Sequence, residues 1–202
     1  MTHLAYDAWL VDLDGTLYHA RRLKLVMALD LLIHPRAIRV VRAFRAEHEH
    51  LRRDAFQSAE VSPFDEQVAR VAQATGMPHD EVRDTVMTWM VNRPSRWLRR
   101  FRRESLIRDL NSFRNNGGKT ALVSDYPATH KLQALDAAWL FDVVVANGEP
   151  DGPDSLKPSA SGLLKAATKL EVHPNRCLVV GDRDDADGQA ARRAGMGFRL
   201  VG

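Results

Sequence analysis

Two aspartates at the end of the first apolar run constrain the fold of this chain more than any other feature. Residues 8–11 are Ala, Trp, Leu and Val, and Asp12, Asp14, Gly15 and Thr16 lie within the next five positions. An apolar run that ends in a glycine turn is typical of a buried strand, and both carboxylates would project from its carboxyl end, where open α/β sheets bind ligands. A turn alone explains Asp14 and Gly15, but it does not explain a charge at Asp12 inside the apolar run. Two carboxylates ~4 Å apart repel each other by roughly 4 kcal/mol at an effective dielectric constant of ~20. Mg²⁺, which prefers oxygen ligands, would remove that repulsion.

Further apolar runs follow in the second half of the chain and alternate with helical patterns. We expect strands at residues 120–123, 141–146, 177–180 and 198–201. We expect helices at residues 104–115, 128–138 and 159–170. Strands that alternate with helices indicate an α/β fold with a parallel sheet covered on both faces.

Residues 20–100 have a different pattern, with helical spacing of apolar residues and no convincing strand. The spacing predicts helices near residues 23–31, from Pro35 onward, at residues 64–74 and at residues 80–91. Asn92-Arg93-Pro94 is expected to turn the chain back toward the sheet. The sequence therefore predicts an all-helical insert after the first strand.

Four motifs follow one another in an order that resembles the haloacid dehalogenase (HAD)-like hydrolase superfamily. Asp12-Leu13-Asp14-Gly15-Thr16 resembles its first motif, DxDGT, and Ser124 after a strand resembles the second. Lys157 before Pro158 resembles the third, and Gly181-Asp182 with Asp187 resembles the fourth, GDx4D. The resemblance is to the helical-cap, phosphoglycolate phosphatase-like branch. It implies a Rossmann-like parallel sheet core at residues 1–17 and 101–202, with an α-helical cap at residues 18–100 inserted after the first strand.

The resemblance also implies roles for individual residues. Asp12 would be the nucleophile, Asp14 would exchange protons with the leaving group and water, and Lys157 would complete the catalytic set. The residues implied in phosphate or substrate binding are Ser124, Asp125, Gly15 and Thr16. The residues implied in holding Mg²⁺ are Asp12, Asp14 through its carbonyl, Asp182 and Asp187. Asp184 and Asp185 crowd the fourth motif, so either could take the place given to Asp187.

These roles imply a Mg²⁺-dependent phosphatase that hydrolyses a small phosphate monoester through an aspartyl-phosphate. A phosphomutase on the same core, or a non-catalytic binding protein built on this scaffold, are the alternatives. Asp14 counts against a dehalogenase, because that branch lacks an acid at this position. The cap is expected to set specificity. Its candidate contacts are Tyr18, His19, Arg42 and Arg45.

Charge and composition limit the kinds of partner that we expect for this chain. Residues 18–118 carry 19 Lys and Arg against 12 Asp and Glu, which suits an anionic substrate, although solvated basic helices explain it equally well. The sequence lacks the aromatic and basic interleaving of an RNA-binding surface, a membrane-length apolar run and a signal peptide. His48-Glu49-His50 lacks the spacing of a zinc motif. A single Cys177 fits a reducing compartment. We therefore expect a cytoplasmic protein, monomeric or homodimeric, that binds a small phosphorylated metabolite and neither nucleic acid nor membrane.

Overall fold

The computed structural model, which describes residues 5–54, 56, 58 and 60–202, contains a five-stranded parallel sheet. The strand order is β3-β2-β1-β4-β5. The strands are β1 (Ala8–Val11), β2 (Lys119–Ser124), β3 (Val143–Ala146), β4 (Cys177–Gly181) and β5 (Gly197–Leu200). The first strand is therefore central, with Val11 in register with Leu122 on one side and Val180 on the other. The predicted α/β class and parallel sheet are confirmed.

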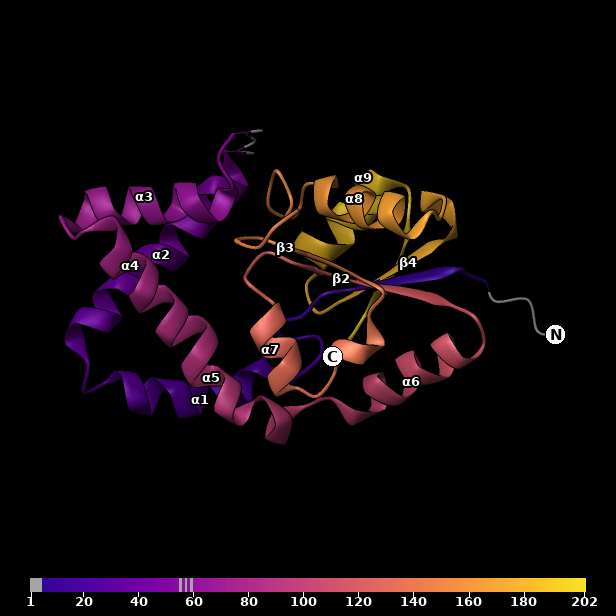
Figure 1. Cartoon of the computed structure of the whole chain (residues 1–202), viewed down its shortest axis with the longest axis horizontal. Coiled ribbons are helices and arrows are strands. Elements are labelled where there is room, and N and C mark those ends of the chain that lie inside the picture. Colours follow the sequence, from indigo (N-terminus) through magenta and orange to yellow (C-terminus); the bar gives the residue numbers. More distant parts are fainter. Residues whose placement is uncertain (1–4, 55, 57, 59) are drawn as a thin grey trace.

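Helices cover both faces of the sheet (Figure 1). Helices α8 (Ser161–Leu170) and α9 (Gln189–Ala194) lie on one face, and α6 (Glu104–Asn115) and α7 (Thr129–Ala134) lie on the other. Neighbouring strand residues point to opposite faces, so Leu10 packs with the first pair of helices and Val11 with the second. Burial on both faces explains why the strands are almost entirely apolar.

Helices fill the chain between β1 and α6, and we call this part the helical segment. They are α1 (Ala20–Leu31), α2 (Pro35–Arg53), α3 (Pro63–Thr75), α4 (His79–Val86) and α5 (Arg93–Leu98). Phe44 of α2, Phe64 and Val68 of α3, and Val82 of α4 meet in a buried cluster separate from the two clusters against the sheet. Figure 1 shows this segment at one end of the sheet. No strand occurs among the described residues between β1 and β2, in line with the sequence pattern.

The chain does not turn at Asn92-Arg93-Pro94 as expected. A π-helical turn (Met87–Asn92) follows α4 directly, and α5 follows that turn. Pro94 is the second residue of α5, and Asn92 and Arg93 before it already have helical backbone angles, so the helical path continues through the proline. The chain returns to the sheet only after a 3₁₀ turn (Arg99–Phe101), where Arg102 forms an isolated bridge with Tyr18. In the part of the chain that the structure describes, every helix is too short or too polar to cross a bilayer.

Candidate active site

The first and fourth motifs meet because their strands are neighbours. Asp12 directly follows β1 and Asp182 directly follows β4, and β1 pairs with β4 along the whole length of β1. The Asp12 amide continues the pairing by donating to the Val180 carbonyl at 2.9 Å. The carboxyl ends of both strands therefore place the two aspartates at the same edge of the sheet.

Three carboxylates converge at this edge. Oxygen atoms of Asp12, Asp182 and Asp187 all lie within 4.8 Å of one another. Asp187 reaches the group from a π-helical turn (Asp184–Gly188), and its side chain is 3% exposed. Carboxylate oxygens at this spacing suit a hard divalent cation such as Mg²⁺.

Lys157 is the cation that balances part of this charge. Its Nζ lies 2.7 Å from Asp12 Oδ1 and 2.8 Å from Asp187 Oδ1. Burial raises the pKa of Asp12 to about 8, with Lys157 opposing the rise and Asp187 adding to it. Burial by itself would lower the pKa of Lys157, but the charges of Asp12 and Asp187 raise it well above its usual value. Burial and the charge of Asp187 also raise the pKa of Asp182. The carboxyl groups of this cluster therefore resist full ionisation when Lys157 is the cation beside them.

Asp14 lies beside this cluster with partners of its own. Lys131 Nζ lies 2.7 Å from its Oδ1 and 2.9 Å from its Oδ2, and the Tyr18 hydroxyl donates to Oδ1. Burial and the neighbouring charge of Asp14 raise the pKa of Tyr18, so the phenol keeps its proton. Asp14 therefore lies at the rim of the site with two donors of its own.

The other motif residues support the same edge. The Thr16 hydroxyl, fully buried, donates to Asp12 Oδ2 at 2.9 Å. Ser124 is buried at the end of β2, and its Oγ accepts from the Tyr126 amide at 3.1 Å. Asp125 Oδ1 accepts from the Lys157 amide at 3.1 Å, which ties the loop after β2 to the loop that carries the lysine.

The helical segment closes the site with one face of α2. A cavity of about 100 Å³ lies over the acids and is lined from α2 by His48, Glu49 and Arg52. Arg52 Nε donates to the Lys157 carbonyl at 2.5 Å. His48 stacks on Tyr126 with ring centroids 4.6 Å apart. Burial lowers the pKa of His48, although the charge of Asp125 opposes this, so the ring is neutral.

The three acids that follow Asp182 in the fourth motif have different surroundings in the structure. Asp184 pairs with Arg192 at 2.9 Å, and Asp185 pairs with Arg183 at 2.5 Å, both on the surface. These ion pairs lower the pKa of each carboxyl. Asp187 alone of the three lies in the carboxylate cluster.

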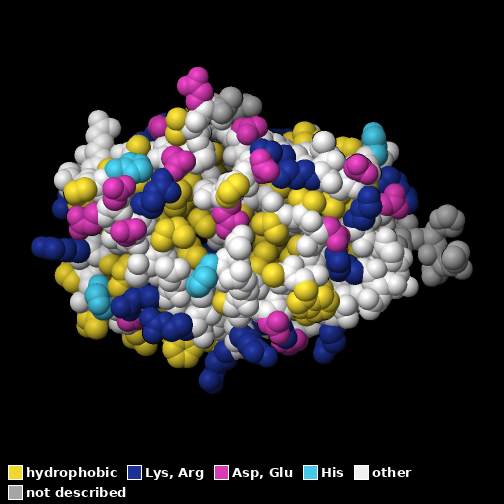
Figure 2. All heavy atoms as spheres, in the orientation of Figure 1, with side chains coloured by type: hydrophobic (Ala, Val, Ile, Leu, Met, Phe, Trp, Pro, Cys, Tyr) yellow, Lys and Arg dark blue, Asp and Glu magenta, His cyan; other side chains and the backbone are white. Residues whose placement is uncertain are grey.

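Most of the residues that were expected to contact the substrate from the cap lie outside the cavity. Tyr18 reaches Asp14, but Arg42 and Arg45 are exposed, and neither they nor His19 lines the cavity. Figure 2 shows Lys and Arg side chains spread around the outline of this face, with several along its lower edge. Most of the positive charge of the helical segment is therefore solvated.

Several residues that line or contact the site were not predicted from the sequence, among them His48, Arg52 and Lys131. His48 lies four positions after Phe44 and three before Leu51, both of which are buried, so helical periodicity alone would have turned it inward. Arg52 lies one turn further along α2, and the same periodicity is the only sequence signal for its position. Lys131 lies in a six-residue helix with no periodic pattern, and we find no sequence signal for its role.

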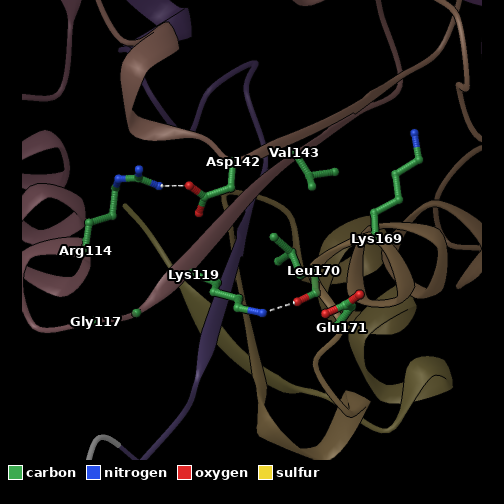
Figure 3. A pocket seen from close by; sticks show the side chains of 9 residues that line it. Arg114, Gly117, Lys119, Asp142, Val143, Lys169, Leu170 and Glu171 are labelled. Carbon is green, nitrogen blue, oxygen red and sulfur yellow. Dashed lines mark hydrogen bonds and ion pairs between the residues drawn. The ribbon is translucent and has the colours of Figure 1, made fainter.

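A second hollow, of about 380 Å³, lies at the opposite edge of the sheet (Figure 3). Lys119 and Val143 line it from the first residues of β2 and β3, and Glu171 lines it from the end of α8. Its cations are already engaged: Lys119 donates to the Leu170 carbonyl at 2.6 Å and Arg114 pairs with Asp142 at 2.6 Å. This hollow holds none of the motif residues.

Solved structures share this fold. A HAD phosphatase from Thermococcus onnurineus aligns with 97% of this chain and 86% of its own, with a TM-score of 0.56 and 19% identity. L-2-haloacid dehalogenase from Xanthobacter autotrophicus, with chloropropionic acid covalently bound, aligns with 97% of this chain and 77% of its own, with a TM-score of 0.64 and 20% identity. At these identities the likeness shows the fold and not the reaction.

One curated relative matches part of the sequence. The protein named probable D-glycero-D-manno-heptose-1,7-bisphosphate 7-phosphatase of Thermoplasma acidophilum is 41% identical over 51 residues, which is 25% of this chain and 32% of the relative. The match thus spans about a third of that protein's length. The haloacid dehalogenase-like hydrolase family matches residues 6–195, nearly the whole chain. The chain is a member of the haloacid dehalogenase-like hydrolase family.

Proposed function

We propose that this protein is a Mg²⁺-dependent phosphatase that hydrolyses a small phosphate monoester through an aspartyl-phosphate. The observation that carries the proposal is that Asp12 belongs to a three-carboxylate cluster and that Asp14 lies beside this cluster. Asp12 supplies an oxygen nucleophile, and Asp14 supplies a second carboxyl group for proton transfer. A dehalogenase needs no proton for a departing halide, whereas an alkoxide leaving group does.

The chemistry of the donor set fits a divalent cation. Asp12, Asp182 and Asp187 offer three oxygens within 4.8 Å, and Lys157 alone neutralises them only in part. The residues that would hold Mg²⁺ are Asp12, Asp182 and Asp187, with the Asp14 carbonyl. When bound, the cation would neutralise charge on these carboxylates and on the transferred phosphoryl group.

Each of these residues has its own role in the proposed reaction. An Asp12 oxygen attacks phosphorus while the bond from phosphorus to the ester oxygen breaks, and Asp14 gives that oxygen a proton. Asp14 then accepts a proton from water as the water oxygen attacks phosphorus, which releases phosphate and restores Asp12. Lys157 and Ser124 hold phosphoryl oxygens, and Gly15, Thr16 and Asp125 shape the loops around them.

The helical segment acts as the cap in this proposal, with its boundaries near residues 18 and 100. Arg52 and His48 reach the edge of the sheet that carries the acids, so closure of the segment would exclude water from the reaction. A cavity of about 100 Å³ favours a phosphoryl group on a small alcohol.

A phosphate-release screen over phosphorylated metabolites, with Mg²⁺ or with EDTA, tests the proposal. We expect release from at least one small monoester, loss with EDTA and loss in the Asp12→Asn variant. Conversion of one sugar phosphate isomer to another without phosphate release would identify a phosphomutase. Full turnover by Asp12→Asn would contradict the nucleophile and with it the proposal.

A further inference from the structure

Asp14 has a buried cation of its own. Lys131 belongs to α7, on the face of the sheet that also carries α6, and its side chain is only 4% exposed. Its Nζ contacts both oxygens of Asp14, at 2.7 and 2.9 Å. A lysine is rarely buried unless it is paired, so this contact accounts for its burial.

Two lysines pair with three of the four motif aspartates of the site. Lys157 contacts Asp12 and Asp187, whereas Lys131 contacts only Asp14. The three-carboxylate cluster accordingly excludes the Asp14 side chain. Since nearby carboxylates repel one another, a cation of its own gives Asp14 a partner apart from the other three acids.

The surroundings fix the position of Lys131. Both Oε atoms of Glu149 bind the start of α7, with contacts of 2.7 Å from the Ala128 and Thr129 amides and from the Thr129 hydroxyl. Lys131 Nζ lies 5.7 Å from the centre of the Tyr126 ring. The Tyr18 hydroxyl donates to Oδ1 of Asp14, an oxygen that Lys131 also contacts. The carboxylate is therefore held by two donors from different parts of the chain.

We propose that Lys131 is a positioning residue, which holds the Asp14 carboxyl apart from the other acids so that it can pass a proton to the leaving oxygen. This inference rests on the proposed phosphatase function. Without Lys131, Asp14 loses the partner that fixes its orientation, and proton transfer to the leaving group suffers more than attack by Asp12.

Esters that differ in their need for a proton test this role. An alkyl phosphate such as glycerol phosphate needs a proton on its leaving oxygen, whereas p-nitrophenyl phosphate loses a stabilised phenolate that does not. We expect Lys131→Met to lower kcat/KM on the alkyl ester by about 100-fold or more, within the range of general acid catalysis, and on p-nitrophenyl phosphate by less than about tenfold. Lys169→Met, which alters an exposed lysine of α8, should change neither.

A double-mutant cycle on the alkyl ester completes the test. If Lys131 acts through Asp14, the Asp14→Asn/Lys131→Met variant should be no slower than Asp14→Asn alone. If thermal melting shows that Lys131→Met is unfolded, Lys131→Gln replaces it with the same expected ratio. Equal losses on both esters, or losses that multiply in the double variant, would overturn the inference. A wild-type protein that releases no phosphate from either ester would instead count against the phosphatase proposal itself.

Discussion

A Cβ atom added to Gly15 would lie 2.0 Å from Oδ2 of Asp182. The backbone of Gly15 has φ of +103°, a conformation that residues with a side chain rarely adopt. The first motif therefore needs glycine for two reasons: the turn after β1 requires this backbone conformation, and the carboxylate at the end of β4 occupies the space of a side chain.

Gly15→Ala should displace Asp182 and weaken the carboxylate cluster. We expect the variant to need at least about tenfold more Mg²⁺ for half-maximal phosphatase activity, because a misplaced ligand weakens metal binding. Gly117→Ala is the matched control, since φ is +86° there but nothing lies within 4 Å of the added Cβ. Both variants carry backbone strain of about 1 kcal/mol. Equal Mg²⁺ requirements in the two variants would show that the clash with Asp182 is unimportant.

The buried carboxyl of Asp12 should make the metal-free protein less stable as the pH rises. Its pKa is about 8 in the folded protein against an ordinary value of 3.8, so folding favours the protonated form. The stabilisation from this group is complete below about pH 4 and is lost as the pH rises toward about 8. One pKa unit corresponds to about 1.4 kcal/mol, so the effect amounts to a few kcal/mol.

Urea unfolding in EDTA between about pH 5 and about pH 8 would measure this dependence. The Asp12→Asn variant lacks the titrating group, so its free energy of unfolding should fall less over the same range. Parallel curves for the two proteins would contradict the raised pKa.

Mg²⁺ should stabilise the folded protein even without substrate. A ligand that binds only the folded state adds about 2.7 kcal/mol at about one hundred times its dissociation constant. We expect a higher melting temperature with Mg²⁺ than with EDTA, and little difference for Asp182→Asn, which loses one charged ligand. Asp185→Asn is a suitable control, because Asp185 pairs with Arg183 outside the cluster. A shift of the same size in Asp182→Asn as in the wild type would show that the ion binds elsewhere.

The parts of the site that lie at strand ends could be predicted from sequence. Asp12, Ser124 and Asp182 each follow an apolar run, and parallel strands bring their carboxyl ends to one edge whatever connects them. The spacing of the fourth motif also pointed to Asp187. Its choice over Asp184 and Asp185 needed the structure, because the π-helical turn decides which acid faces inward.

The residues that reach the site from helices were harder to predict. Arginines are frequent along α2, and the sequence does not show that Arg52 is buried while Arg42 and Arg45 are exposed. That difference depends on how α2 packs against the sheet, which no local pattern encodes. The same holds for Lys131, whose burial follows from its pairing with a residue 117 positions away. The turn expected at Pro94 was wrong for another reason, since a π-helical turn directly before α5 carries the helical path through the proline.

Arg52→Ala should weaken the hold of α2 on Lys157. The Arg52 side chain is 6% exposed, and its Nε donates to the carbonyl of Lys157 at 2.5 Å. A hydrogen bond from a charged donor contributes about 1.5–3 kcal/mol, so we expect a loss of that order in the free energy of unfolding. We also expect kcat/KM on the best substrate from the phosphate-release screen to fall by about tenfold or more, because Lys157 loses part of its support.

Arg53→Ala gives the matched control for that change, because Arg53 is the next residue of α2 and its side chain is exposed. Removing an exposed arginine should change stability by no more than about 0.5 kcal/mol and should leave turnover unchanged. Chemical unfolding and steady-state kinetics on both variants separate a local effect from a general effect of charge. If Arg52→Ala behaves like Arg53→Ala in both measurements, the contact between α2 and Lys157 contributes nothing to the site, and the helical segment must close over the acids through other residues.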